Sequence, residues 1–442
     1  MRSCFKSVVT ATCLVVAICA ICLMSLLFAT QTAQAGNIYD KDGFKLDFSF
    51  EAAAIYIKSD NTYFGAGQNI TSKKDIYWTE YYIKPSLSST YTLGNSTTIY
   101  ANLAAIGQAT RGDGNINSSD NGDDMAIDKA YIGWKSGKLF ETEDLFDLSV
   151  GRQNFLVGRG FFMYKQGGDD PSAYWLAPNS HFNNTAIARI NWKPVRADFA
   201  WVQTNEASSD TQSYGVNIEY FNEQFAALDQ ATLAVAYFNT AESDKSGWDG
   251  LDVYNIRANF APLATMGMSD LYISAEYVKQ ENSGSHDVDA DAYFAEIGYN
   301  FSKVLWTPKL FYRYAYFSGD DPATVTTDES YQYYFEGGTG WGTWYTEILG
   351  DYYGFNNNSQ NQIQLEVHPS ESLSAGIIYY SMDSDEGNKK IGDELNIYAD
   401  YVINDWVSIG GCYAWASPDA VAKSEFGFDN AQKIELYTYL YF

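Results

Sequence analysis

Cysteine and histidine are scarce in this 442-residue chain. Most of its cysteines lie before residue 36: Cys4, Cys13, Cys19 and Cys22. Cys412 is the only cysteine that follows, so internal disulfides and thiolate metal clusters are excluded there. A single cysteine in a strand-like run is typical of a small buried hydrophobe rather than of a nucleophile.

Basic residues are also few. The chain carries 28 Lys and Arg against 55 Asp and Glu, a formal net charge of −27. Phosphate binding needs a basic surface, so this balance argues against nucleic acid as a partner.

The first 35 residues differ from the rest. Arg2 and Lys6 give a basic start, Val8–Phe28 is almost unbroken apolar sequence, and Ala33–Ala35 has a small-x-small pattern. These features predict a signal peptide over residues 1–35, with a mature chain from Gly36. A retained membrane anchor is the alternative, because the run is long enough to span a bilayer. No later window holds the roughly 18 apolar residues that a spanning helix needs.

Strict alternation of polar and apolar residues dominates the remainder. It is clear in Lys45–Glu51, Gln362–Val367 and Glu394–Asp400. Period two places one set of side chains on each face of a strand. Aromatic residues make up 17% of the chain, as in membrane barrels with aromatic girdles. We therefore predict an all-β fold: a transmembrane antiparallel β-barrel over residues 36–442, its apolar face toward lipid and its polar face toward the lumen.

The alternation predicts about 18 strands, which start near residues 43, 75, 95, 126, 145, 185, 196, 212, 230, 251, 270, 290, 307, 360, 372, 392, 405 and 430. Every second connection looks short, as at Leu93–Asn95, Lys193–Val195, Pro369–Glu371 and Ile403–Asp405. The connections between them are mostly longer and acidic, including 109–125, 153–184, 318–359 and 416–429. Short periplasmic turns and long extracellular loops produce this pattern in a barrel.

The chain ends on a strand whose faces are well separated. Ile434, Leu436, Thr438, Leu440 and Phe442 share one face, opposite Glu435, Tyr437, Tyr439 and Tyr441. A terminal aromatic residue resembles the signal by which the barrel-assembly machinery recognises outer-membrane barrels. The alternative is a closing strand without that role.

Signals for catalysis are poor. His181, His286 and His368 are scattered, and no HExxH, GxSxG or phosphate-loop pattern occurs. We therefore expect no enzyme and no cofactor, although a Ser-His or carboxylate site built across strands stays open as an alternative.

The acidic loops raise the question of calcium. Asp113–Asp124 superficially follows calcium-loop spacing but has Ser118 where glycine is expected and Asp124 where Glu is expected. A solvated acidic loop is favoured there, and also for Asp169-Asp170, Asp320-Asp321 and Asp383–Glu386. We expect no metal site. Divalent cations that bridge lipopolysaccharide phosphates to these loops remain a hypothesis.

Basic residues inside strands are informative because they are few. On the lipid face an arginine would cost about 2–4 kcal/mol at the membrane centre, so the lumen is the expected location. The candidate pore-lining residues are Arg152, Arg159, Arg189, Arg257 and Arg313, with the carboxylates Asp47, Glu51, Glu276 and Glu366. The arginines form either a ladder for anionic solutes or ion pairs that only brace the wall.

Three short stretches resemble the alginate-export family of outer-membrane porins. They are Asp128–Trp134, Leu148–Gln153 followed by Gly158–Gly160, and Tyr314–Asp321. The resemblance implies an 18-stranded barrel and a transport role. The alginate exporter it resembles has an electropositive lumen suited to a polyuronate, whereas this chain is strongly acidic. The resemblance therefore leaves the solute open.

Together these features predict a channel in the outer membrane of a Gram-negative bacterium, surrounded by lipid and lipopolysaccharide. Small hydrophilic or anionic solutes would diffuse through it passively, including a polyuronate or another carbohydrate. The longest loops are 153–184 and 318–359, and aromatic segments such as Tyr331–Phe335 and Trp341–Tyr345 are candidates to fold inward and narrow the pore; whether the two loops plug the lumen is left open. The alternative is a non-conducting surface barrel that displays acidic loops for adhesion or lipopolysaccharide organisation. A homotrimer is compatible with either.

Overall fold

The structure is a computed structural model. It describes residues 36–65, 73–94, 96–113, 122–164, 172–204, 210–283, 287–335, 346–354, 356–425 and 429–442. The predicted leader, residues 1–35, lies outside this part of the chain, as do His286, Asp169-Asp170, Trp341–Tyr345 and most of the calcium-like loop.

Alternating sequence forms strands wherever it was expected. Each barrel strand begins within a few residues of its predicted start; β13, for example, begins at Asp287 where the alternation predicts 290. The strands are β1 (Gly36–Lys41), β2 (Phe44–Asp60), β3 (Ile76–Thr92), β4 (Thr98–Gly112), β5 (Asp123–Lys135), β6 (Phe146–Gln153), β7 (Phe182–Trp192), β8 (Val195–Gln203), β9 (Thr211–Tyr220), β10 (Leu233–Ser243), β11 (Asp252–Phe260), β12 (Leu271–Ser283), β13 (Asp287–Asn300), β14 (Lys309–Phe317), β15 (Thr327–Asp328), β16 (Asn358–Ser370), β17 (Leu373–Ser384), β18 (Lys390–Asn404), β19 (Val407–Pro418) and β20 (Ala431–Tyr441).

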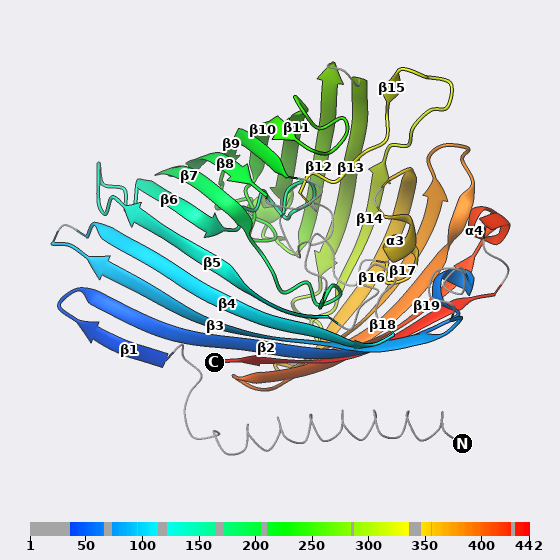
Figure 1. Cartoon of the computed structure of the whole chain (residues 1–442), viewed down its shortest axis with the longest axis horizontal. Coiled ribbons are helices and arrows are strands. Elements are labelled where there is room, and N and C mark those ends of the chain that lie inside the picture. Colours follow the sequence, from blue (N-terminus) through cyan, green and yellow to red (C-terminus); the bar gives the residue numbers. More distant parts are fainter. Residues whose placement is uncertain are drawn as a thin grey trace.

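These strands form one closed antiparallel barrel (Figure 1). Consecutive strands pair as hairpins from β2 to β14 and from β16 to β20, and β14 pairs with β16. The barrel closes where β20 pairs with β2, from Glu51↔Tyr441 to Asp60↔Gln432. Over the described residues it therefore has 18 strands, as predicted. Of the two other strands, β1 extends the sheet at β2, and the short β15 pairs in parallel with the end of β13.

Among the described residues, short helical turns lie only in connections. They are η1 (Thr62–Gly65), η2 (Ala264–Met266), α3 (Leu349–Tyr353) and α4 (Ala420–Glu425). In the part of the chain that the structure describes, no helix is long and apolar enough to cross a membrane.

The two rims of the barrel differ. One rim, called here the turn rim, carries Gly36 and Phe442, the two ends of the described chain. It also carries the connections that follow odd strands from β3 to β13, together with 371–372 and 405–406. The other, the loop rim, carries the long connections 154–181 and 318–357. The alternation of short and long connections is looser than predicted, because the turn-rim connections 136–145, 221–232, 261–270 and 301–308 span eight to twelve residues. A bridge between Leu139 and Thr142, and the turn η2, give these longer turns local structure.

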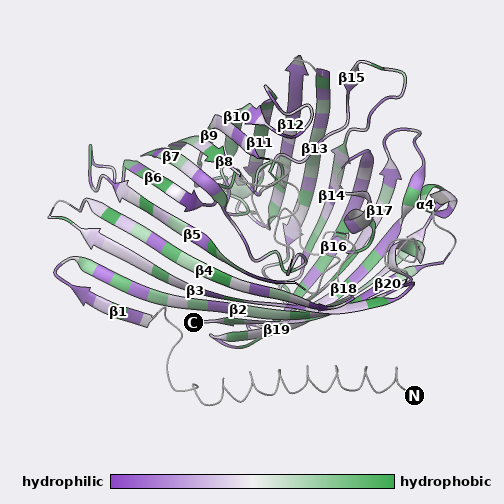
Figure 2. Ribbon diagram, in the orientation of Figure 1, coloured by the Kyte–Doolittle hydropathy of each residue, from purple (hydrophilic) through white to green (hydrophobic). Residues whose placement is uncertain are grey.

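Hydropathy alternates along the strands (Figure 2). The outward face is apolar: Ile83 is 52% exposed, Leu103 51% and Ile256 56%. Exposed apolar side chains in a continuous belt are what lipid contact requires. The predicted faces of the last strand are also observed, since Leu436 is exposed whereas Lys433 and Glu435 are buried.

The inward face is less polar than predicted. Ile55, Ile57 and Trp78 point inward and are at most 4% exposed. They pack with Ala173 and Leu176, from the connection that follows β6. These inward apolar residues lie toward the loop rim, where segments of the long connections fold into the barrel and exclude water from the wall.

The two ends of the described chain meet at the turn rim. Phe442 exchanges two backbone hydrogen bonds with Phe50, of 2.8 and 2.9 Å. Beyond that point β1 takes over the same edge of β2, where Gly36 pairs with Phe48. A β-carbon at Gly36 would lie 3.4 Å from the ring of Phe442. The barrel seam is thus continued by the N-terminal strand.

Candidate functional site

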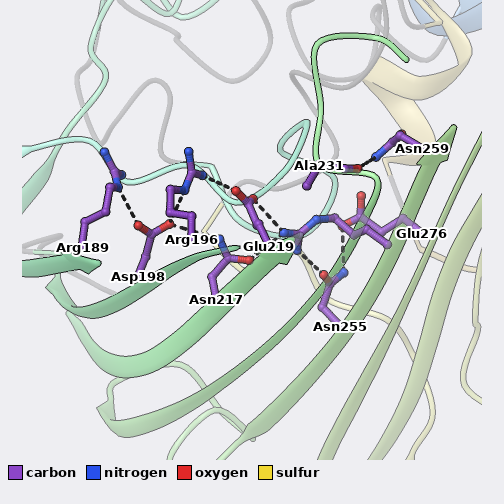
Figure 3. Close-up of polar contacts among 10 residues, drawn as sticks. Arg189, Arg196, Asp198, Asn217, Glu219, Ala231, Asn255, Asn259 and Glu276 are labelled. Carbon is purple, nitrogen blue, oxygen red and sulfur yellow. Dashed lines mark hydrogen bonds and ion pairs between the residues drawn. The ribbon is translucent and has the colours of Figure 1, made fainter. Parts of the chain in front are cut away.

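A connected group of charged side chains lies on the inward face of β7 to β12 (Figure 3). Arg189 donates from Nε to Oδ1 of Asp198 at 2.6 Å, and Nε of Arg196 lies 3.4 Å from the other oxygen. Arg196 also pairs with Glu219, whose Oε1 lies 3.1 Å from Nη2 of Arg257. Alternation produces this arrangement, because each of these residues faces the lumen from its strand.

Asparagines complete the group. Arg257 donates from Nη2 to Asn217 at 2.6 Å and from Nη1 to Asn255. Asn255 in turn donates to Glu276 at 2.8 Å. Arg257 is only 3% exposed and Glu276 only 4%. A buried charge needs such partners, since an isolated one would pay a large desolvation cost. We call Arg189, Asp198, Arg196, Glu219, Arg257 and Glu276 the arginine network.

A second ion-pair group adjoins it on β13 and β14. Arg313 donates from Nε to Glu296 at 2.6 Å and from Nη1 to Gln362 at 3.1 Å. Arg159, from the connection after β6, lies 3.4 Å from the same Glu296 carboxylate. Its neighbour Gly158 has a φ of +58° and packs so closely on Arg257 that a β-carbon would lie 2.7 Å from the arginine Cδ. The connection therefore folds deep into the barrel and contacts both groups.

Aromatic side chains fix that connection in place. Phe161 lies 5.0 Å from Phe294, measured between ring centroids, and Phe162 lies 6.1 Å from Phe238. Phe162 also stacks on Tyr334 of the loop between β14 and β16, with centroids 6.4 Å apart. The segment Tyr331–Phe335 therefore folds inward, as proposed from the sequence, and it packs there with the connection after β6. The segment Trp341–Tyr345 lies outside the described residues.

Arg152 lies apart from the arginine network. It lies in a β-bulge between β6 and β7. By simple alternation along β6, it falls on the same face as the exposed Leu148 and Val150. Its guanidinium donates to the Ile127 carbonyl at 2.5 Å and to Asn183. These contacts place Arg152 near the loop rim, whereas the other four candidate arginines face the lumen.

The candidate carboxylates of β2 and β16 lie toward the turn rim. Glu51 accepts a hydrogen bond from Tyr82, and Glu366 accepts one of 2.5 Å from Tyr398. Asp47 pairs with Lys45 at 2.9 Å. Two of these three candidates therefore accept hydrogen bonds from inward-facing tyrosines, Glu51 from the neighbouring strand β3 and Glu366 from β18, two strands away.

Across the lumen from the arginine network, the loop segment 346–353 docks on β18 and β20. Glu394 accepts backbone hydrogen bonds from Ile348 at 3.1 Å and Leu349 at 2.8 Å. Lys433 donates to the carbonyl of Glu347 and lies 3.4 Å from Asp351. Burial raises the pKa of the Glu347 carboxyl well above its usual range, and the nearby Glu435 carboxylate raises it further. Besides the hydrogen bonds to Glu394, the ammonium group of Lys433 holds the segment, and it does so among the carboxyl groups of Glu347, Asp351 and Glu435.

His181 is a bracing residue in this structure. Its Nδ1 lies 3.2 Å from Asp128, which is fully buried and also lies 3.1 Å from Lys84. Among the described residues no serine hydroxyl bonds to His181. Nor do they contain a group of three His, Cys, Asp or Glu residues placed to hold a metal ion.

Several inward residues escaped the sequence analysis. Arg196, Asp198, Glu219 and Glu296 belong to the two ion-pair groups, and Lys433 anchors the loop segment 346–353. The signal for β8 was available, because Arg196 and Asp198 alternate with the outward Val195 and Phe199. Lys433 and Glu296 also alternate with outward residues of their strands. Their loop partners, Asp351 and Arg159, are far away in sequence and could not be predicted from that alternation.

Comparisons with known proteins agree with this architecture. The family profile described as Alginate export matches residues 95–405. Among solved structures, OccK2 (OpdF) of Pseudomonas aeruginosa aligns with a TM-score of 0.58 and 11% identity, over 90% of this chain and 97% of that one. OpdQ of the same species aligns with a TM-score of 0.57 and 12% identity, over 91% and 99% of the two chains. At such low identity these likenesses establish the fold. A search of curated protein sequences found no match.

Proposed function

The chain belongs to the alginate export family, and from that we propose a channel of the Gram-negative outer membrane that passes small hydrophilic or anionic solutes by passive diffusion. A polyuronate or another carbohydrate is the solute class we favour. The observation that carries the proposal is the arginine network, which presents Arg189 and Arg196 inside a closed barrel with 35% and 32% of their side chains exposed.

Guanidinium groups suit an anionic solute. Their planar array of donors matches a carboxylate in two-point geometry, and they stay charged at any physiological pH. In a channel, rings of charged side chains set selectivity together with pore radius. Arg189 and Arg196 would form the accessible part of such a ring, while the buried Arg257 would hold its neighbours in position.

The pairing within the network limits how strongly it attracts anions. Each exposed guanidinium already contacts the Asp198 carboxylate. A passing anion would compete with that carboxylate for the unused N–H donors, so we expect brief binding. Weak binding at several sites favours conduction over capture.

Conductance of the refolded mature protein in a planar bilayer under a salt gradient tests the proposal. Open steps with anion preference are expected, and the Arg189→Gln/Arg196→Gln double variant should lower that preference. Arg111→Gln is the matched control, since Arg111 is exposed at the loop end of β4 and pairs there with Asp123. Unchanged selectivity in the double variant would remove the arginine network from the proposal.

One observation favours a second candidate, the non-conducting surface barrel. Segments of both long loops pack inside the barrel, where Phe161, Phe162 and Tyr334 are fully buried. A lumen filled in this way passes no ions. Silence at all voltages, from protein shown to be folded, would favour this candidate and overturn the channel.

The chain termini and the acidic loops also have proposed roles. Residues 1–35 would be removed on export, and Phe442 would be read by the barrel-assembly machinery. The acidic loops would meet lipopolysaccharide through divalent cations; binding that does not depend on calcium would remove that last element. No catalytic step is proposed.

A further inference from the structure

Three tyrosines follow one another on the inward face of β20. Tyr437, Tyr439 and Tyr441 alternate with the outward residues of the strand and line the wall toward the turn rim. The ring centroids of Tyr437 and Tyr439 are 5.9 Å apart, and those of Tyr439 and Tyr441 are 6.0 Å apart with planes only 7° from parallel. Tyr437 meets Tyr439 edge to face, with planes 66° apart, whereas Tyr439 and Tyr441 stack. The three rings form a row on the inner wall, called here the tyrosine strip.

A glycine on the next strand sets how the first ring lies. Tyr437 crosses β19 at Gly410, where a β-carbon would lie 2.6 Å from the ring Cζ. Its hydroxyl then reaches Asp400 on β18, with a hydrogen bond of 2.5 Å. Gly410 thus leaves space for the ring, and Tyr437 and Tyr439 also pack against the inward apolar cluster that contains Ile55 and Leu176.

The groups beside the tyrosine strip are hydrogen-bond acceptors. Asp400 lies on one side, and on the other Glu51 accepts a hydrogen bond from Tyr82 of β3. In the described part of the chain, no lysine or arginine lies within 4 Å of the carboxylate of Glu51, Asp400 or Glu366. The arginine network lies about halfway round the order of strands, so its guanidiniums are separated from these carboxylates.

This combination of groups selects a ligand. Flat aromatic faces bind the apolar faces of sugar rings, and carboxylates accept strong hydrogen bonds from hydroxyl groups. A uronate carries a negative charge on each residue, so the carboxylates here would repel it. We propose that the tyrosine strip is a binding track for neutral, hydroxyl-rich saccharide chains. This rests on the proposed channel function and, between the two solute classes favoured there, selects a neutral carbohydrate over a polyuronate.

Tyr439 is the position that tests the track. Neither Tyr439 nor Tyr441 has a hydrogen-bonded partner among the described residues, so truncation there leaves the Tyr437–Asp400 and Tyr82–Glu51 contacts in place. Tyr413 of β19 is the matched control, because it points outward toward lipid and is 39% exposed. Tyr439→Phe keeps the ring and should keep binding.

The measurement is block of single-channel current by a neutral malto-oligosaccharide of six glucose units, added on the turn-rim side, against an oligogalacturonate of equal length. The neutral sugar should produce transient block, and Tyr439→Ala should weaken its apparent affinity about tenfold, as expected for the loss of one aromatic contact. Tyr413→Ala and Tyr439→Phe should leave it within about twofold.

The outcomes separate the track from the channel. Open channels that the neutral sugar does not block, or that the uronate blocks equally well through Tyr439, would overturn the track and leave the channel standing. If no channel opens, saturation-transfer NMR of the same sugar with the detergent-solubilised barrel decides. Transfer that Tyr439→Ala abolishes would support the track although the channel has failed, and the absence of transfer would overturn it.

Discussion

Tyr437 reaches over Gly410 to donate its hydroxyl hydrogen to Asp400, two strands away, at 2.5 Å. The same arrangement recurs elsewhere on the wall. Tyr398 crosses Gly376 to reach Glu366, again at 2.5 Å. In each case the missing β-carbon leaves room for the ring, and a carboxylate on the strand beyond the glycine accepts the hydrogen bond from the hydroxyl.

Gly410→Ala should therefore destabilise the barrel. A β-carbon would lie 2.6 Å from Cζ of Tyr437, so the ring must leave the wall and Asp400 must lose its donor. Overpacking of this kind costs about 1–3 kcal/mol, measured as a lower urea midpoint for unfolding from lipid bilayers. Gly94→Ala is the control, because nothing lies within 4 Å of the position of its β-carbon. Equal midpoints for the two variants would contradict this role of Gly410.

Arg257→Met should be more damaging than its size suggests. Arg257 is 3% exposed and contacts Glu219, so its loss leaves that buried carboxylate with Arg196 as its remaining arginine partner and leaves Oε1 without its guanidinium. Removal of one member of a buried pair costs about 3–5 kcal/mol. The double variant Arg257→Met/Glu219→Gln should recover part of this loss in the same unfolding assay. If the two losses simply add, the pair does not interact as described.

Phe162→Ala should increase conductance as well as lower stability. The ring is fully buried between Phe238 and Tyr334, where it joins the two long loops. Truncation leaves a cavity that costs about 3–5 kcal/mol and loosens the inward-folded segment. Larger or more frequent current steps are expected. Leu156→Ala, in the same connection but 47% exposed, should change neither property.

Docking of the segment 346–353 should depend on pH. The pKa of the Glu347 carboxyl is raised by burial and by Glu435, so the folded state holds a proton that the unfolded segment has already lost. Docking is then most stable below the ordinary pKa of about 4.3 and weakens as the pH rises through the higher folded value. The amides of Ile348 and Leu349, which donate to Glu394, should exchange faster at higher pH after correction for intrinsic rates.

Glu347→Gln should remove most of that dependence, since the amide cannot ionise. The Ala173 amide, which donates to the hydroxyl of Thr110 at 2.8 Å, provides an internal control without a carboxyl group. Exchange at Ile348 that rises with pH equally in wild type and variant would assign the effect to another group.

The sequence predicted the strands because a barrel strand is local in origin. Its side chains point in turn toward the outside and the inside of the barrel, so the polar–apolar alternation at Gln362–Val367 was sufficient to predict β16. Parity likewise predicted that Arg189 and Arg257 face the lumen, as they do. Arg152 shows the limit of such reasoning, because a bulge changes the register where β6 meets β7.

No comparable sequence pattern predicts how the loops pack inside the barrel. Ile55 and Ile57 are apolar on the inward face because Ala173 and Leu176 cover them, and this contact joins residues more than a hundred positions apart. Arg159 meets Glu296 for the same reason. Contacts between an aperiodic loop and a distant strand leave no periodic trace in the sequence, whereas the faces of a strand do.

The meeting of Gly36 with Phe442 has a practical consequence for chain engineering. Residues added after Phe442 would run along the edge of β2 that β1 already occupies. If residues 1–35 are removed on export, as proposed, residues added before Gly36 would begin beside the terminal ring. An affinity tag at either end would thus compete with the opposite end for the same strand edge. The connection 385–389 on the opposite rim avoids this conflict, so a tag inserted there would leave both termini paired.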